Sequence, residues 1–309
     1  MSKLQAVTSN PVIKQYAQGV AASSVQPIAN FLAPVVPVPT QVGRFKKYTP
    51  ESRFRLPDTA RALGGPATQL RFEVKDGSYQ CQPQALDAPI DNLEKLEAAE
   101  LEDAVKDAAV SVAEIAALCH EKKVIDLATG AVAATSKTWN SSADPVKDLD
   151  DAIRSVLLNA TYGSAMDVGV LFGVDAWLIF KNQAKVRELL PVGAKANGIA
   201  VPDENIASAM LLGGPKCRVS FMAYDASPEG KQANPSFILG SDIFIFARKD
   251  NPTRRDPSFM KTFRLRNQYM VPGSYQKEDG RGEVAKFDWS EDPQIVNASA
   301  CVRLTVGTV

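Results

Sequence analysis

The 309-residue sequence has one histidine, four scattered cysteines and no net charge, with 35 basic and 35 acidic side chains. A Ser-His-Asp or Cys-His nucleophile would need His120, which we predict instead to be a helix C-terminal cation or a surface residue. The cysteines form no C-x-x-C pair, and with one histidine they exclude the usual zinc ligand sets. Cys81, Cys119, Cys217 and Cys301 are expected to be buried free thiols in a reducing cytoplasm.

Motifs for binding phosphate or spanning a membrane are also lacking. Gly64-Gly65 and Gly213-Gly214 are each followed by a proline, which removes an N–H donor, so we predict turns there and no phosphate cradle. No apolar run reaches the roughly 18 residues of a membrane helix, and no secretory signal opens the sequence. Because the charges balance, tight nucleic-acid binding is not expected to be the main function. The sequence predicts no active site, no cofactor and no metal site.

The first distinctive segment is an apolar, proline-rich arm at residues 1–44. Its prolines forbid a continuous helix and favour extended backbone, and they stand at Pro27, Pro34, Pro37 and Pro39. An extended apolar arm cannot bury itself well, so we expect it to lie on a neighbouring subunit. The apolar side chains predicted to make this contact are Phe31, Leu32, Val35 and Val36.

A basic hairpin and an acidic helix are predicted next. Residues 44–75 hold eight Lys/Arg and three acids, or +5, around the Gly64-Gly65 turn, and the alternation at 70–74 predicts a returning strand. Residues 91–122 have apolar side chains at steps of three and four, with Asp91 as the helix cap. Residues 87–123 hold ten acids and four lysines, or −6. One narrow Ala-rich face is expected to pack, and a broad acidic face to remain outside. The packing positions predicted are Leu93, Leu96, Leu101, Val105, Ala108, Val112, Ile115 and Cys119.

The remaining sequence predicts a small α/β layer. Residues 123–140 are expected to form short strands around a glycine turn, and residues 144–160 an amphipathic helix capped by Asp144. Residues 167–182 predict a buried strand running into a helix, and residues 199–246 further strands. Residues 248–281 are polar and basic, and the last fifteen residues are strand-like.

In this order, the segments resemble the major capsid proteins of tailed bacteriophages. The stretches that carry the resemblance are VPVPTQVGRFKKY, DGSYQCQPQALDAPIDN, DPVKDLDDAIRSVL, VLFGVDAWLIFKN and FILGSDIFIFARKDNP, which together span residues 36–252. The resemblance implies an α+β fold, the tailed-bacteriophage major-capsid fold. Its expected segments are an N-terminal arm (1–44), an extended basic hairpin loop (45–83), a peripheral domain with a spine helix (84–145), an axial domain (146–250), a return through the peripheral domain (251–292) and a C-terminal strand (293–309).

The resemblance also implies contacts between subunits, in which the hairpin of one subunit lies over the spine helix of its neighbour. Opposite charge would then set the register of the contact. The hairpin residues expected at this contact are Arg53, Arg55, Arg61 and Arg71, and the helix residues are Glu94, Glu97, Glu102 and Asp103.

The function implied is structural: a shell protein, not an enzyme, that assembles into an icosahedral head around a phage double-stranded DNA genome. Expected partners are further copies in pentamers and hexamers, a portal protein and a scaffolding protein, with DNA enclosed without sequence recognition and no membrane. The expected location is the virion capsid, after assembly in the bacterial cytoplasm. Two alternatives stay open: a cellular nanocompartment shell of the same fold, and an α/β enzyme with its site in residues 146–250.

Overall fold

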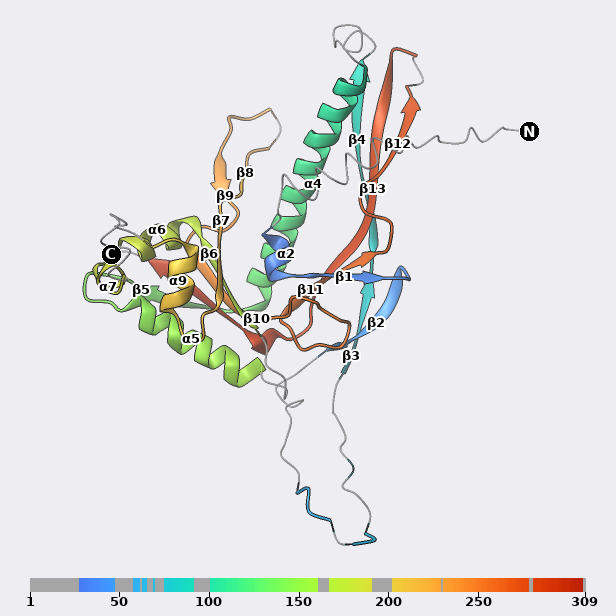
Figure 1. Ribbon diagram of the computed structural model, residues 1–309. Coiled ribbons are helices and arrows are strands. Elements are labelled where there is room, and N and C mark those ends of the chain that lie inside the picture. The colour runs from blue at the N-terminus through green and yellow to red at the C-terminus, as the bar shows by residue number, and fades with distance from the viewer. Residues whose placement is uncertain are drawn as a thin grey trace. The chain divides into compact units, whose positions relative to one another are not determined.

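The computed structural model describes residues 28–47, 58–61, 63–65, 69, 75–91, 101–160, 167–190, 202–228, 230–277 and 280–307 (Figure 1). The chain forms two compact units, each assembled from segments far apart in the sequence. Unit 1 comprises residues 1–43, 79–125 and 262–294, and unit 2 comprises residues 44–78, 126–261 and 295–309. The chain therefore returns to each unit more than once.

Unit 1 combines a five-stranded sheet with one long helix. The sheet order is β1 (Val35–Val38), β11 (Met260–Leu265), β13 (Gly282–Ile295) and β12 (Val271–Gln276), and β4 (Gln82–Asp91) also pairs with β13. Helix α4 (Leu101–Ala131) runs along β4 and β13 (Figure 1). Val112, Ala113 and Ala116 of α4 pack against Phe287 and Trp289 of β13. The small alanines let the helix backbone approach the strands closely, which buries the two large aromatic rings.

The predicted helix start at Asp91 is wrong, because this residue ends β4. Strand β4 pairs with β13 over ten positions, from Gln82↔Glu291 to Asp91↔Gly282. Pro83 and Pro89 favour this extended backbone, and both are tolerated because, among the described residues, β4 pairs only with β13 and its other edge is open. Residues 92–100 lie outside the described part of the chain, so Leu93 and Leu96 are not placed.

The predicted helix end is also wrong, since α4 continues to Ala131 through the segment predicted as short strands. Val124, Ile125 and Ala128 are buried and continue the packed face. The packed face is rotated from the one predicted: Ile115 is 50% exposed and Cys119 is exposed. In an Ala-rich helix, periodicity alone does not distinguish a packing alanine from an exposed one.

Part of the arm packs into its own chain, which corrects the prediction that it lies on a neighbour. Helix α2 (Ala29–Leu32) is followed by β1, which pairs in parallel with β11. Leu32 and Val36 are buried, Phe31 and Val35 are half-buried, and the Thr262 hydroxyl donates to the Ala33 carbonyl at 3.1 Å. Deleting residues 1–40 would therefore remove a strand of unit 1 and its pairing with β11. Residues 1–27 lie outside the described residues.

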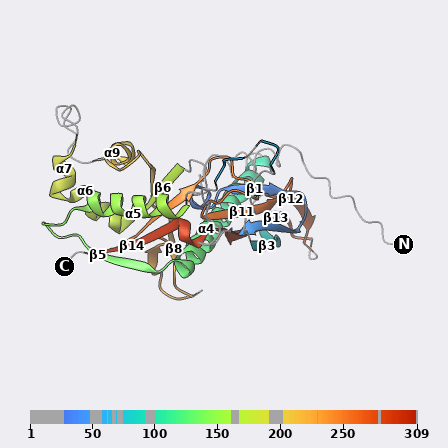
Figure 2. The ribbon, with the colours of Figure 1, turned by 90° about the horizontal axis from the view of Figure 1, so that it is seen from below.

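Unit 2 is built on a second five-stranded sheet. Its order is β5 (Ala134–Thr138), β14 (Cys301–Gly307), β10 (Asp242–Arg248), β6 (Asp167–Gly173) and β7 (Lys216–Ser220). Helices α5 (Pro145–Ala160) and α6 (Val174–Asn182) lie beside these strands (Figure 2), and both contact β6 and β10. The central strands β6 and β10 are buried almost throughout, as expected of strands covered on both faces.

Several predictions in unit 2 are confirmed. The helix at 144–160 is α5, and the Lys147 N–H donates to the Asp144 carboxylate at 3.2 Å, as a helix cap requires. The predicted strand followed by a helix is β6 and α6. The predicted terminal strand is β14, which follows a short 3-10 helix, η2 (Ala298–Ala300). The prediction of strands through 199–246 missed α9 (Glu204–Met210), and α7 (Ala184–Glu188) was not predicted.

Two small two-stranded sheets complete the described elements. Strand β2 (Val42–Lys47) pairs with β3 (Lys75–Gln80), and the segment predicted to be the basic hairpin connects these two strands in the sequence. Strand β8 (Ala223–Asp225) pairs in antiparallel with β9 (Pro235–Phe237). The predicted returning strand at 70–74 lies outside the described residues, and β3 begins at Lys75.

His120 is buried between α4 and the sheet of unit 1, which corrects its predicted place at a helix end or on the surface. Its side chain is 6% exposed, and its Nδ1 lies 2.8 Å from Glu291 Oε1. Arg264 reaches the other oxygen of Glu291 at 2.7 Å. Arg264 also lies over the ring of Tyr269, with its guanidinium carbon 3.8 Å from the ring centroid. Two positively charged or protonatable side chains thus surround one buried carboxylate.

The electrostatic effect on Glu291 is large. Burial alone would raise the pKa of this carboxyl, but the hydrogen bond and charge of His120 and the Arg264 guanidinium lower it to about 2. A carboxyl with a lowered folded-state pKa stabilises the fold above its unfolded pKa, and that contribution is lost as the pH falls through the folded pKa. The ion pairs of Glu291 therefore favour the folded unit 1 at neutral pH.

We predict that Glu291→Gln lowers the free energy of unfolding by about 3 to 5 kcal/mol at pH 7, because it leaves the Arg264 charge buried without its partner. Wild-type stability should decline between about pH 5 and pH 2, and the variant should decline less steeply there. Denaturant unfolding across a pH series measures both. Asp288→Asn, an exposed carboxylate on the same strand, should change stability by no more than about 0.5 kcal/mol. Equal pH slopes for wild type and Glu291→Gln would contradict this assignment.

Gly173 at the end of β6 is required by a close backbone approach. The Val174 and Asp175 N–H groups donate to the carbonyls of Leu239 and Gly240 at 3.1 Å each, which satisfies the first donors of α6. A Cβ at Gly173 would lie 2.1 Å from the Gly240 carbonyl oxygen. The adjacent backbone of residues 239–240 leaves no room for a side chain here.

We predict that Gly173→Ala destabilises unit 2 by about 1 to 3 kcal/mol, since backbone must move to admit the methyl group. Gly130→Ala is the matched control, because Gly130 lies in α4 and its added Cβ would meet nothing within 4 Å. The control should stabilise by about 0.5 to 1 kcal/mol through helix propensity. Thermal melts of the two variants compare them directly, and similar shifts would refute the steric argument.

Candidate inter-subunit surfaces

The structure places few of the predicted contact residues. Arg61 is exposed, as predicted for a hairpin residue that contacts a neighbour. Arg53, Arg55, Arg71, Glu94 and Glu97 lie outside the described residues. Glu102 and Asp103 lie in the first turn of α4, but their side chains are not described. The paired hairpin and helix surfaces therefore stay a prediction.

The described part of the hairpin is exposed, and its predicted turn is confirmed. Gly64 adopts φ +77°, a left-handed conformation that glycine reaches without strain, and residues 63–64 form a turn. Leu63 next to it is fully exposed.

Strands β2 and β3 pack closely at the base of the hairpin. The ring of Phe45 on β2 is buried, and it fills the space that a side chain at Gly77 of β3 would need. On the same two strands, Lys46 Nζ lies 2.6 Å from an Asp76 carboxylate oxygen. The hydrogen bond and charge of Lys46 lower the pKa of Asp76. Strands β2 and β3 thus provide an ordered starting point for the hairpin.

A hollow of about 250 Å³ opens beside this base, and we call it the cationic hollow. Its lining residues are Arg44, Phe45, Lys46, Asp76, Arg254 and Arg255. The lining thus contains four cations and one carboxylate. Arg44, Arg254 and Arg255 are exposed, and the Lys46 N–H donates to the Arg254 carbonyl at 3.2 Å. This backbone bond fixes the arginine loop to β2.

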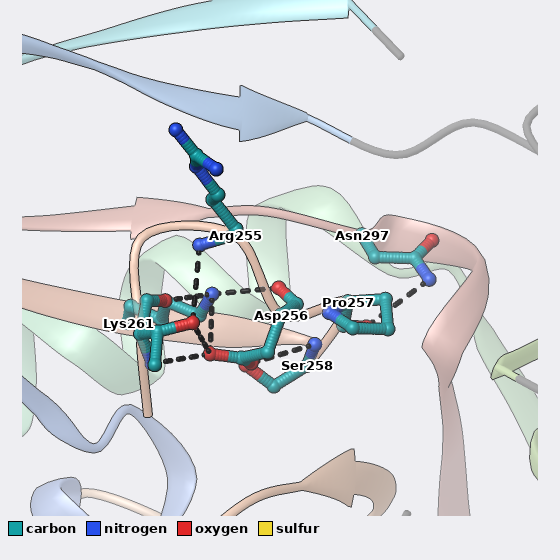
Figure 3. Close-up of polar contacts among 7 residues, drawn as sticks. Arg255, Asp256, Pro257, Ser258, Lys261 and Asn297 are labelled. Carbon is teal, nitrogen blue, oxygen red and sulfur yellow. Dashed lines mark hydrogen bonds and ion pairs between the residues drawn. The ribbon is translucent and has the colours of Figure 1, made fainter. Parts of the chain in front are cut away.

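A buried ion pair between Asp256 and Lys261 stabilises the loop that carries Arg254 and Arg255. Lys261 is 0% exposed, and its Nζ lies 3.0 Å from the Asp256 carboxylate and 2.6 Å from the carbonyls of Thr253 and Asp256. The Ser258 hydroxyl donates to the other Asp256 oxygen at 2.6 Å. Figure 3 shows this network, with the Arg255 side chain pointing away from it.

This network is saturated with hydrogen bonds, so the loop has one preferred conformation. Burial alone would raise the pKa of Asp256, but the charge of Lys261 and hydrogen bonds from Ser258 and Thr253 lower it. The Asn297 amide contributes a further hydrogen bond to the Pro257 carbonyl at 3.4 Å. A buried ion pair is stable only with such complete satisfaction, and it then fixes local geometry.

The outer face of β4 and β13 in unit 1 has the opposite charge, and we call it the acidic sheet face. Asp87 and Asp91 are exposed and four residues apart on β4, so they share one face of the strand. Asp288 of β13, which pairs with Ala85, is exposed on the same face. The Tyr275 hydroxyl donates to Asp87 at 3.1 Å. Lys286 of β13 pairs in register with Asp87, and its Nζ lies 3.7 Å from a carboxylate oxygen of Asp288, so one cation offsets part of this negative charge.

The described outer face of α4 is less acidic than predicted. Its exposed residues include Asp107, Glu114, Lys123 and Asp126, with Ile115 between them. Most of the predicted negative charge belongs to residues 87–103, of which only 87–91 are fully described. The described acids at the N-terminal end of this segment are therefore Asp87 and Asp91 of β4.

Sequence reasoning missed Arg254 and Arg255 as surface-forming residues. The available signal was the run NPTRRDPSF, in which two adjacent arginines stand between Pro252 and Pro257. Within the described ranges, no three His, Cys, Asp or Glu side chains gather as metal ligands do, and no helix has the length and apolar character to cross a membrane. Cys81, Cys217 and Cys301 are buried as predicted, and burial raises the pKa of Cys217 to about 12.

No family model matches the sequence, and no curated protein matches it. Solved structures do match. A phage-related protein from Bordetella bronchiseptica superposes with a TM-score of 0.71 at 20% identity, covering 97% of this chain and 98% of that one. The capsid of cyanophage P-SCSP1u matches with a TM-score of 0.56 at 10% identity, over 90% and 87% of the two chains.

A third similar structure is the encapsulin from Synechococcus elongatus, with a TM-score of 0.53, 12% identity, and 99% and 92% of the two chains covered. These similarities extend over nearly the whole chain and include proteins from phage capsids and from an encapsulin. The fold expected from the sequence is confirmed: this chain has the α+β fold of tailed-bacteriophage major capsid proteins.

Proposed function

We propose that this protein is a structural shell protein, not an enzyme, that assembles into an icosahedral head around a phage double-stranded DNA genome. The observation that carries the proposal is the fold, which matches a phage-related protein from end to end and a phage capsid over most of the chain. The exposure of the described hairpin residues 58–61, 63–64 and 69 agrees with it, since a loop that contacts a neighbouring subunit would be exposed in a single chain.

The proposed assembly consists of pentamers and hexamers of this chain in a closed lattice, formed in the bacterial cytoplasm with a portal and a scaffolding protein. Closed lattices use the same surfaces repeatedly, so each contact energy is multiplied over many copies. DNA would be enclosed without sequence recognition, which agrees with the balanced charge of the chain. The virion capsid is the proposed location.

A cellular nanocompartment shell is the second candidate, since an encapsulin shares the fold. The two are separated by what the shell contains and by its size. Purified particles should be imaged and their contents digested with nuclease and with protease. Large heads that protect DNA support the capsid proposal, and small cages that enclose one protein cargo support the nanocompartment. Monomers under all assembly conditions would refute both.

We predict that reversing Arg53, Arg55 and Arg61 to Glu lowers particle yield while sparing the fold. In the proposed contact the hairpin lies on the acidic helix of a neighbour, including Glu94, Glu97, Glu102 and Asp103, so the change places like charges together. The loss should shrink as salt rises, because the Debye length of about 8 Å at physiological strength shortens.

Sedimentation of particles across a salt series measures this effect. Arg154→Glu with Lys231→Glu is the control, since both cations are exposed in unit 2 and neither belongs to the hairpin. Lys substitutions at the four acids, added to the triple variant, should restore part of the yield. Equal yields from wild type and the triple variant at low salt would exclude the charge match.

A further inference from the structure

Strand β5 (Ala134–Thr138) forms one edge of the unit 2 sheet, beside β14 (Figure 2). We propose that this edge is a docking site for a second copy of this chain, which adds an extended segment to β5 as a further strand. The inference rests on the proposed function, because it assigns one of the contacts of the shell. It differs from the predicted hairpin contact, since backbone groups and not charges make it.

Alternate residues of β5 direct their backbone N–H and C=O groups away from the sheet. The Trp139 N–H, directly after the strand, donates to the Gly307 carbonyl of β14 at 3.1 Å. Because hydrogen-bonding directions alternate along a strand, residues 135 and 137 also face β14, and residues 134, 136 and 138 face outward. Within the described part of the chain, no strand pairs with this outer side of β5.

The two faces of β5 are uncovered as well. Every residue of the strand is exposed except Lys137, which is half-buried. Strands that pair in parallel, as β5 does with β14, are usually covered on both faces. Lys137 Nζ lies 2.8 Å from Asp148 of α5, and the Trp139 indole donates to the same carboxylate at 2.9 Å. These contacts hold the end of the strand on α5 and neutralise its one charged side chain.

The outer strands of both sheets other than β5 carry a feature that blocks strand addition. On β7, at the opposite edge of the unit 2 sheet, the Val219 N–H donates to the Glu204 carboxylate of α9 at 2.9 Å. Arg218 binds the other oxygen of Glu204 at 3.2 Å. The outer strands of unit 1 contain prolines, at Pro37 in β1, Pro83 and Pro89 in β4, and Pro272 in β12. Prolines and covering side chains are means by which proteins prevent pairing at sheet edges. Among the described residues of these two sheets, β5 is the edge strand without either.

A second copy is favoured over DNA as the occupant of this edge. Lys137 is paired with Asp148, so the strand offers no free cation to a phosphate backbone. An extended polypeptide, by contrast, matches the spacing of the outward N–H and C=O groups and binds them through its own main chain. Each copy presents one such edge, so the donor segment must be as abundant as the edges. Further copies of the chain meet this requirement in a lattice that repeats one contact.

Hydrogen exchange of backbone amides tests the proposal in the wild type. The Ser136 and Thr138 N–H groups should exchange freely in the unassembled subunit, and about tenfold or more slowly in particles assembled from the purified chain. The Lys137 and Trp139 N–H groups face β14 and serve as the internal reference, because they should be protected in both states.

Ser136→Pro tests the same edge by substitution. Proline removes the outward N–H and leaves the hydrogen bonds of residues 135 and 137 to β14 in place. We expect particle yield, measured by sedimentation, to fall about tenfold or more. Ser136→Ala is the matched control, since it loses the same hydroxyl but keeps the N–H, and it should keep the wild-type yield. Far-UV circular dichroism and melting establish that each variant is folded before its yield is compared.

The outcomes separate this inference from the proposed function. Wild-type particles in which the Ser136 and Thr138 amides exchange as fast as in the free subunit overturn the inference and leave the proposed function intact. A folded Ser136→Pro variant with wild-type yield does the same, and if this variant does not fold, the exchange measurement decides alone. Protection that is lost when DNA or a second protein is removed from the particles assigns the edge to that partner and also overturns the inference. If the wild type forms no particles under any assembly condition, the proposed function fails and this inference fails with it.

Discussion

The close packing of α4 on strands β4 and β13 is the constraint on which unit 1 depends. The helix contributes Ala113, Ala116 and Ala117 to this interface, so its backbone can lie near the sheet while Phe287 and Trp289 fill the remaining space. The strands come from widely separated parts of the chain, so unit 1 cannot form from local contacts alone. The same interface encloses Glu291 between His120 and Arg264. A buried carboxylate is tolerated there only because two partners offset its loss of hydration.

Much of unit 2 was predictable, because its elements follow local rules. The helix at 145–160 has an Asp cap, a proline in its first turn and a clear apolar face, and β6 and β10 are continuous apolar runs. Unit 1 was harder because non-local pairing overrides its local signals. Residues 82–91 look like the approach to an acidic helix until β13 is present to pair with them. Gly130 suggested a turn, yet it lies inside α4, whose buried face continues to Ala128.

The sequence indicated the charge of the candidate surfaces but identified only some of the residues that form them. The sequence correctly indicated a turn at Gly64, which has the left-handed conformation that such a turn uses, and the contacts of the basic hairpin stay a prediction. It could not indicate that Arg254 and Arg255 join Arg44 and Lys46 around one hollow, because these residues are brought together by a loop far along the chain. It also misplaced His120, since a lone histidine near lysines gives no sign that a distant glutamate faces it. Counting acidic and basic residues identifies the segments with an excess of one charge, but only the fold shows which segments contact each other.

The overall neutrality of the chain has a physical consequence, because positive and negative side chains gather on different surfaces. Overall neutrality means that two copies neither attract nor repel each other at long range, so encounter is not driven by net charge. The charged side chains are segregated: Arg44, Arg254 and Arg255 line one hollow, and Asp87 and Asp91 lie on one face of β4. Segregated charges act within about one Debye length, where they select the orientation of a contact more than its strength. In the proposed shell, identical subunits would have to reject many wrong orientations, and local charge complementarity on a neutral chain can do this. Most of the stability of such a lattice would then come from apolar burial.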